Sequence, residues 1–252
     1  MIYYICALQC EAVPFIRRLN LKKNPAYTRM DVFENENSTV MVAGNGMLNS
    51  AMSVTELLAS GSVSAEDFIV NVGICGYMGN RNLPFGTALI CNMIKSEYNG
   101  RKYYPDMIYK SPFEEYQVIT YNNAVHDGKG KGECLADMEA AGVYEGAIRF
   151  VKTSQIAFIK IVSDYCDGNF PSKNQVESYI DENADAIIKW AESVYELINS
   201  THKAGLTAEE EFLMNATADR LRYSVTRRNQ LKNQLIYEKI IGKDIVKLME
   251  DM

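Results

Sequence analysis

Short apolar runs alternate with helical patterns through about the first 200 residues of the chain. Four runs are rich in β-branched and aliphatic side chains, as expected of strands that are buried on both faces. They are residues 2–8, 39–43, 68–73 and 156–162. Apolar positions with helical spacing occur at residues 11–19, 48–59, 137–151 and 175–198. This alternation predicts an α/β domain with a largely parallel sheet.

Three weaker patterns predict further strands, with antiparallel pairing at a sheet edge as one arrangement. They are residues 27–33, 87–94 and 116–121. The polar and aromatic stretch between two of them, residues 95–113, is interpreted as a loop or an interface element.

The pattern changes near residues 200–205. Residues 206–252 contain no strand pattern and no proline, and their spaced apolar positions predict two or three amphipathic helices. Thr207 and Glu210 have the spacing of a capping box, which predicts the start of the first helix. We therefore expect an α/β domain at residues 1–203 and a helical C-terminal extension at residues 204–252.

Composition narrows the class of protein. The net charge of −6 excludes a broadly basic nucleic-acid surface, and no apolar run reaches the roughly 18–20 residues that cross a bilayer. The apolar N-terminus lacks a basic region, so it is interpreted as a strand and not as a secretory signal. We therefore expect a cytoplasmic protein with reduced cysteines. There is no CxxC pair and there are two histidines, so we expect neither a metal site nor a cofactor.

Polar and glycine residues follow each predicted buried strand. Ligands of open α/β sheets bind beyond the carboxyl ends of the strands. Glu11 follows the first strand, residues 44–46 the second, residues 73–76 the third, and Ser163 with Asp164 the fourth. Together they predict a ligand site. The alternatives are plain strand-to-helix turns, a first-turn helix acid and a helix cap. Neither GxGxxG nor a P-loop is present, which disfavours dinucleotides and nucleoside triphosphates.

The acidic segment 136–142 also has two interpretations. Acids in the first turn of a helix are favoured by the helix dipole. Side chains two positions apart diverge on a helix, so Asp137 and Glu139 serve one ligand together only if the helix begins between them.

Five motifs occur in the order and approximate spacing of one superfamily. They are residues 7–11 (ALQCE), 43–51 (AGNGMLNSA), 71–76 (NVGICG), 137–140 (DMEA) and 163–164 (SD). Over roughly residues 1–200 the chain resembles the nucleoside phosphorylase superfamily, particularly its methylthioadenosine/S-adenosylhomocysteine nucleosidase branch. The resemblance implies a three-layer phosphorylase/hydrolase-like fold: a central mixed, largely parallel sheet flanked by helices.

The resemblance implies cleavage of the bond between ribose and a purine base. It makes Asp164 the general acid, oriented by Ser163, and makes Glu11 the base that activates water. Glu139 would hold the ribose hydroxyls, with Met138 packed against the sugar. The substrate-binding residues it implies are Gly46, Ile74, Cys75, Gly76, Val125, Met138, Glu139 and Ser163.

The resemblance favours hydrolysis over phosphorolysis. Asn71 and Ile74 stand where related phosphorylases have an arginine and a serine, and the Glu11 carboxylate would repel phosphate. One alternative is a phosphorylase with an atypical phosphate site. The other is a non-catalytic nucleoside sensor that binds nucleic acid through cations of the extension such as Arg227 and Arg228, although a solvated helix face is the simpler interpretation of these cations. The resemblance further implies a role in methionine salvage and a homodimer with residues 95–113 in its contact.

A few further residues need separate interpretation. Val125 or His126 stands where the family has a base-stacking phenylalanine. Cys75 is interpreted as a packing residue, because no base is evident beside it. Lys160 lies inside an apolar strand, and we interpret it as a structural cation paired with a buried carboxylate.

Overall fold

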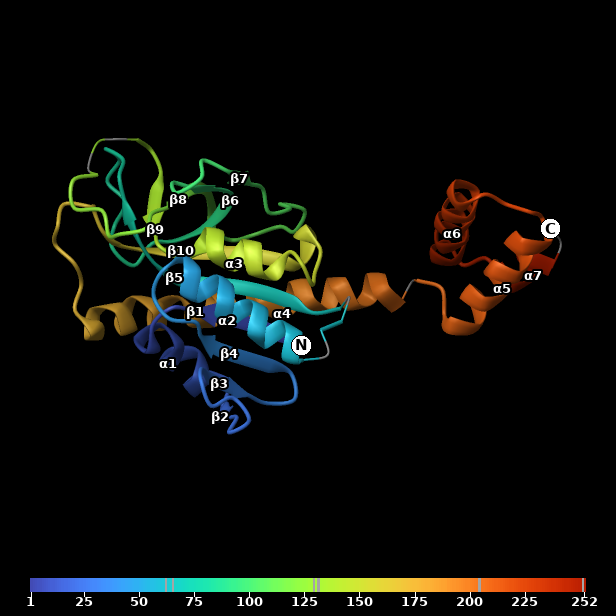
Figure 1. Ribbon diagram of the computed structural model, residues 1–252, viewed down its shortest axis with the longest axis horizontal. Helices are drawn as coiled ribbons and strands as arrows, with labels where there is room; N and C mark the ends of the chain where they lie inside the picture. Colours follow the sequence, from blue (N-terminus) through green and yellow to red (C-terminus); the bar gives the residue numbers. More distant parts are fainter. Residues whose placement is uncertain (62, 65, 129, 131, 204, 251) are drawn as a thin grey trace. The chain divides into compact units, whose positions relative to one another are not determined.

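The computed structural model describes residues 1–252 except 62, 65, 129, 131, 204 and 251, and it forms two compact units (Figure 1). These units are Met1–Tyr195 and Glu196–Met252. The strands are β1 (Ile2–Cys6), β2 (Lys22–Lys23), β3 (Asp31–Glu34), β4 (Ser38–Val42), β5 (Phe68–Tyr77), β6 (Ala88–Ser96), β7 (Lys102–Tyr103), β8 (Glu114–Thr120), β9 (Leu135–Asp137) and β10 (Ile156–Asp164). The helices are α1 (Gln9–Arg18), α2 (Met47–Ser60), α3 (Ala140–Ala147), α4 (Lys173–Lys203), α5 (Ala208–Arg220), α6 (Val225–Ile240) and α7 (Ile245–Glu250), with a 3₁₀ turn at Thr153–Gln155.

One mixed sheet organises the first unit. Strands β4, β1, β5 and β10 are parallel neighbours, so their carboxyl ends lie at one edge. Beyond β10 the sheet continues antiparallel through β6 and then parallel through β8 and β9, and β9 returns to pair with β5. Strands β5, β10, β6, β8 and β9 therefore form a closed circuit beside an open part made of β1, β4, β3 and β2.

Burial explains why the apolar runs become central strands. Every residue of β1 and of β10 is buried, and β5 is buried at all positions except Ile74. The four buried strands and the α/β class predicted from the sequence are confirmed, although β5 and β10 extend a few residues farther than expected. The predicted antiparallel edge is also present, where β3 pairs with β4.

Helices α2 and α3 lie side by side (Figure 1). Two glycines of α3 permit the close approach. A Cβ atom at Gly142 would collide with the carbonyl oxygen of Met47, and one at Gly146 would lie 2.9 Å from the carbonyl oxygen of Ala51. Both helices begin near the sheet edge where the parallel strands end, since Gly46 before α2 is hydrogen-bonded to Glu139 before α3.

The helix predicted at residues 137–151 is the main correction to the fold. Asp137 is the last residue of β9, and α3 spans only Ala140–Ala147. The β9 backbone pairs with both β5 and β8, and this tertiary pairing overrides the helical pattern. Residues 95–113 are also not entirely loop, because β6 continues to Ser96 and β7 pairs with it.

The second unit contains the end of α4 followed by α5, α6 and α7, which confirms the predicted amphipathic helices. Its apolar core consists of Met214, Ala218, Leu231, Leu235, Ile245 and Met249. Thr207 accepts a hydrogen bond from the Glu210 amide and donates its own amide to the Glu210 carboxylate, so the capping box is confirmed. The division into domains after residue 203 stays a prediction.

Four cations of this unit form ion pairs with acids of the same unit. Arg228 pairs with Asp219 at 2.5 Å, and Lys239 pairs with Glu210 at 2.6 Å. Lys232 contacts Glu211, and Lys243 contacts Glu238. Whether the cations of the unit bind nucleic acid stays a prediction. Throughout the described part of the chain, the helices are too short or too polar to traverse a bilayer.

Candidate active site

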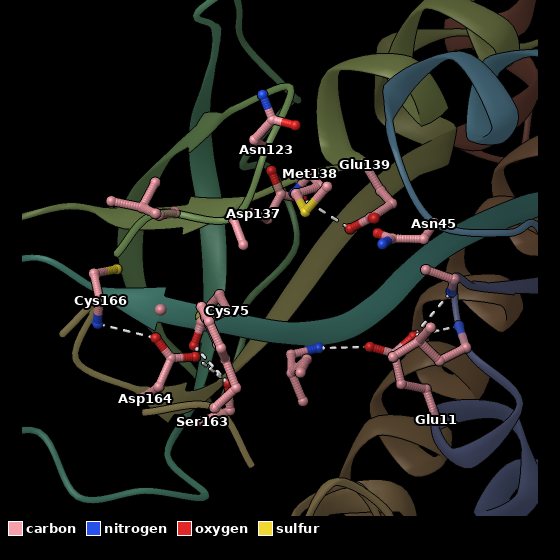
Figure 2. Close-up of a pocket in the computed structure, with 18 residues that line it drawn as sticks. Glu11, Asn45, Cys75, Asn123, Asp137, Met138, Glu139, Ser163, Asp164 and Cys166 are labelled. Carbon is pink, nitrogen blue, oxygen red and sulfur yellow. Dashed lines mark hydrogen bonds between the residues drawn. The ribbon is translucent and has the colours of Figure 1, made fainter. Parts of the chain in front are cut away.

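A cavity of about 180 Å³ opens at the carboxyl ends of the parallel strands. Three acidic side chains that line it come from different elements: Glu11 from the start of α1, Glu139 from the residue before α3, and Asp164 from the end of β10. Figure 2 shows the Glu11 and Glu139 carboxylates on one side of the cavity and Asp164 on the other.

Glu11 is buried and held by backbone amides. One carboxylate oxygen accepts hydrogen bonds from the amides of Ala7 and Leu8 at 2.9 Å, and the other accepts from Ile74 at 2.9 Å. Burial raises the pKa of Glu11, and these hydrogen bonds only partly oppose the rise. These hydrogen bonds fix the carboxylate at the junction of β1 and β5, where it lines the cavity.

Glu139 lies immediately before α3, and Asp137 ends β9. The helix begins after both acids and not between them, so the divergence of side chains along a helix does not apply to this pair. The Gly46 amide donates a hydrogen bond to Glu139 Oε1 at 2.8 Å. Burial and the nearby Asp137 raise the pKa of Glu139 to about 7, while Lys160 and the Gly46 amide oppose the rise. Glu139 therefore changes its charge close to neutral pH.

Asp137 is occupied by structural partners. Its carboxylate lies 2.8 Å from the Lys160 ammonium, and both side chains are almost completely buried. It also accepts hydrogen bonds from the Thr120 hydroxyl at 2.7 Å and from the Ala140 amide at 2.8 Å. Burial by itself would lower the pKa of Lys160, but the nearby carboxylates of Asp137 and Glu139 outweigh it, so the pKa is raised. The interpretation of Lys160 as a cation paired with a buried carboxylate is confirmed.

Asp164 and Ser163 form a hydrogen-bonded unit on the other side of the cavity. Asp164 Oδ1 accepts a hydrogen bond from the Cys166 amide at 2.9 Å. Ser163 Oγ lies 2.8 Å from Asp164 Oδ2 and 3.2 Å from the carbonyl oxygen of Cys75. The Ser163 hydroxyl donates its hydrogen bond to Asp164, so the carboxylate is held by Ser163 on one oxygen and by the Cys166 amide on the other.

Two glycines of β5 give the carboxylates room. A Cβ atom at Gly73 would lie 3.0 Å from Glu11 Oε1, and one at Gly76 would lie 2.8 Å from Asp164 Oδ1. Cys75 between them is buried, and burial strongly raises the pKa of its thiol. A protonated buried thiol is a packing residue rather than a nucleophile.

Most of the residues singled out from the sequence line the cavity. These are Glu11, Ile74, Cys75, Gly76, Val125, Met138, Glu139, Ser163 and Asp164. Gly46 is not among the lining residues, and its observed contact is the hydrogen bond to Glu139. Its φ of 94° favours glycine at this turn.

The sequence did not single out several other lining residues, notably Asn123, Cys166 and Phe170. Cys166 and Phe170 lie in the segment after β10, where no periodic pattern marks side chains that turn toward a site. Among the described residues, no three His, Cys, Asp or Glu side chains are grouped as metal ligands.

Comparison with solved structures shows what the chain is similar to. It matches the Colwellia psychrerythraea methylthioadenosine/S-adenosylhomocysteine nucleosidase in complex with adenine, with a TM-score of 0.64 and 11% identity over 77% of this chain and 95% of that one. It matches Arabidopsis thaliana methylthioadenosine nucleosidase with a TM-score of 0.61 and 16% identity, covering 79% and 95%. A futalosine hydrolase mutant from Helicobacter pylori matches with a TM-score of 0.57 and 14% identity, covering 77% and 97%.

These matches establish the fold. The chain has the α/β fold of the methylthioadenosine/S-adenosylhomocysteine nucleosidases, which confirms the resemblance seen in the motifs at the level of architecture. No family model matches the chain, and comparison with curated protein sequences gives no match.

Proposed function

We propose that the protein is a purine nucleosidase that hydrolyses the N-glycosidic bond of a methylthioadenosine-like nucleoside. The observation that carries the proposal is the convergence of Glu11, Glu139 and Asp164 on one cavity of the nucleosidase fold. Cleavage of a glycosidic bond needs an acid at the leaving group and a base at the attacking water. The carboxylates on opposite sides of the cavity meet both needs.

Asp164 is the general acid of this proposal. The leaving purine accumulates negative charge as its bond to ribose breaks, and a proton delivered to a ring nitrogen neutralises it. The Ser163 hydroxyl donates a hydrogen bond to Asp164 Oδ2 at 2.8 Å and so orients the acid. The Cys166 amide holds the other carboxyl oxygen, so Asp164 keeps one orientation.

Glu11 and Glu139 act at the sugar. Glu11 removes a proton from water as the water attacks the anomeric carbon, and its raised pKa strengthens it as a base. Glu139 in its ionised form accepts hydrogen bonds from two ribose hydroxyls, and Met138 supplies an apolar contact. The negative charges also stabilise the oxocarbenium-like sugar by attraction.

The lining argues against phosphorolysis. No lysine, arginine or histidine is among the described residues that line the cavity. Four acids line it, namely Glu11, Asp137, Glu139 and Asp164. A phosphate dianion needs cationic donors and would be repelled by carboxylates. Hydrolysis is therefore the favoured reaction.

The assembly and the location of the enzyme are also proposed. Leu48 and Met52 of α2 are exposed, as are Tyr98, Tyr104 and Ile108 of the 95–113 segment. Such exposed apolar side chains favour a homodimer, which sedimentation analysis would detect as a doubled mass. We also propose that the enzyme acts in the cytoplasm and that its nucleosidase reaction serves nucleoside metabolism, as part of methionine salvage.

The test is release of free base from a panel of nucleosides with and without phosphate. The panel contains methylthioadenosine, S-adenosylhomocysteine, adenosine, inosine, 5′-deoxyadenosine and futalosine. We expect release that does not depend on phosphate, and we expect Glu11→Gln to slow it by about 10²- to 10⁴-fold. Release only with phosphate would make the protein a phosphorylase. Binding of a nucleoside without release would favour the sensor.

A further inference from the structure

The cavity is lined almost entirely by side chains that are not aromatic. Among the described residues that line it, Phe170 is the single aromatic side chain. Val125, at the position where the motif resemblance leads one to expect a stacking ring, is aliphatic and packs with Met78, Cys134, Ala136 and Cys166. If a flat base binds in this cavity, Phe170 is the available ring.

Phe170 follows the proposed acid closely in the chain. It lies six residues after Asp164, in the segment between β10 and α4. This segment packs on the one that follows β8, because the Gly128 amide donates a hydrogen bond to the carbonyl oxygen of Cys166 at 2.9 Å. The ring centroids of Phe170 and His126 are 5.1 Å apart at an interplanar angle of 85°.

The exposure of Phe170 indicates unused contact surface. Phe170 is 49% exposed, whereas Val125, which also lines the cavity, is half-buried and Cys166 is buried. A large aromatic ring that lines a cavity and retains this exposure gains further apolar contact when a second flat ring enters. The nearly perpendicular contact with the His126 ring leaves about half of the Phe170 surface exposed.

We propose that Phe170 is the base-stacking residue of this site, so that the purine stacks on its ring with a ring nitrogen facing Asp164. The inference rests on the proposed nucleosidase function and adds a specificity-determining residue to it. The stacking aromatic is thereby supplied from the segment after β10 instead of the one after β8. Since the stack forms in the ground state and in the transition state alike, it acts mainly on KM.

The test measures binding of free adenine and hypoxanthine by calorimetry, which requires no turnover. Stacking on an aromatic side chain contributes enough that Phe170→Ala should weaken adenine binding by about tenfold or more. With a nucleoside that the wild type cleaves, the same variant should raise KM by a similar factor and change kcat less than about threefold. Phe212→Ala is the matched control, because Phe212 lies in α5 of the second unit.

A second variant guards against a merely structural effect. In Val125→Phe/Phe170→Ala an aromatic ring lines the cavity from position 125 instead of position 170. We expect the affinity for adenine to recover at least partly. Equal adenine affinity in Phe170→Ala and the wild type would overturn the role of Phe170, and so would a loss that the double variant does not reverse while both variants unfold at the wild-type temperature. A wild type that binds neither base and cleaves no nucleoside would instead overturn the proposed function itself.

Discussion

The charge of Glu139 links the site to pH at the scale of a single residue. With a pKa of about 7, Glu139 is ionised above pH 7 and protonated below it. Only the ionised form accepts hydrogen bonds from two ribose hydroxyls. Affinity for the sugar should therefore be complete above pH 7 and should fall by about tenfold per pH unit as the pH drops well below 7.

The measurement compares two ligands across pH 5–9. A C-nucleoside analogue of adenosine contains ribose and is not hydrolysed, whereas adenine lacks the sugar. We expect only the analogue to lose affinity at low pH, and we expect Glu139→Gln to abolish that pH dependence because an amide does not titrate. An identical pH profile for both ligands would exclude Glu139 as the ribose ligand.

Lys160 supports a second prediction at this scale. Lys160→Met leaves the Asp137 carboxylate buried without its cation, which should lower the free energy of unfolding by about 3–5 kcal/mol. Denaturant titration measures the loss. Asp137→Asn/Lys160→Met removes both charges and should recover part of the stability. A Lys160→Met protein as stable as the wild type would contradict the structural role of the pair.

Packing of α2 against α3 carries a prediction at the scale of elements. Gly142→Ala places a methyl group against the carbonyl oxygen of Met47, so the helices must separate. We expect a loss of about 1–3 kcal/mol in the free energy of unfolding. Nucleoside affinity should also fall, because Glu139 directly precedes α3 and is bonded to Gly46 before α2.

Gly61→Ala is the control for this prediction. Its Cβ atom would lie 3.5 Å from the carbonyl oxygen of Leu57, an ordinary contact, and the backbone there is extended. Thermal unfolding of the two variants side by side should show a loss for Gly142→Ala alone. Equal losses of stability in the two variants would contradict the view that Gly142 is needed for the close approach of α2 and α3.

The same elements show what could be predicted from sequence. Long apolar runs in β1, β5 and β10 were predictable because full burial requires apolar side chains at every position. The three-residue strand β9 is too short to show a period, and the acidic residues at and after its end imitate a helix start. The strand-end rule located Glu11 and Asp164, since Glu11 lies in the first turn of the helix after β1 and Asp164 is the last residue of β10. Phe170 reaches the cavity only through tertiary packing of a loop, so no local pattern could reveal it.

At the scale of the whole molecule, we predict that the first unit binds its ligand without the second. All the residues that line the cavity belong to Met1–Tyr195, and the compared structures cover 75–79% of the chain. A chain ending at residue 203 should therefore bind adenine with the affinity of the full protein, as measured by calorimetry. A loss of adenine binding in a folded truncated chain would mean that the second unit contributes to the site.

The central claim is that the carboxylates of one cavity cleave a purine nucleoside with water. The most direct measurement is the rate of adenine release from methylthioadenosine in phosphate-free buffer, with wild type and Asp164→Asn compared side by side. We predict steady release by the wild type and a rate about 10²- to 10⁴-fold lower for Asp164→Asn, which should still bind adenine. Equal rates for the two proteins would contradict the role of Asp164 as the acid, and a folded wild type that releases no adenine from this substrate or from the rest of the panel would contradict the claim as a whole.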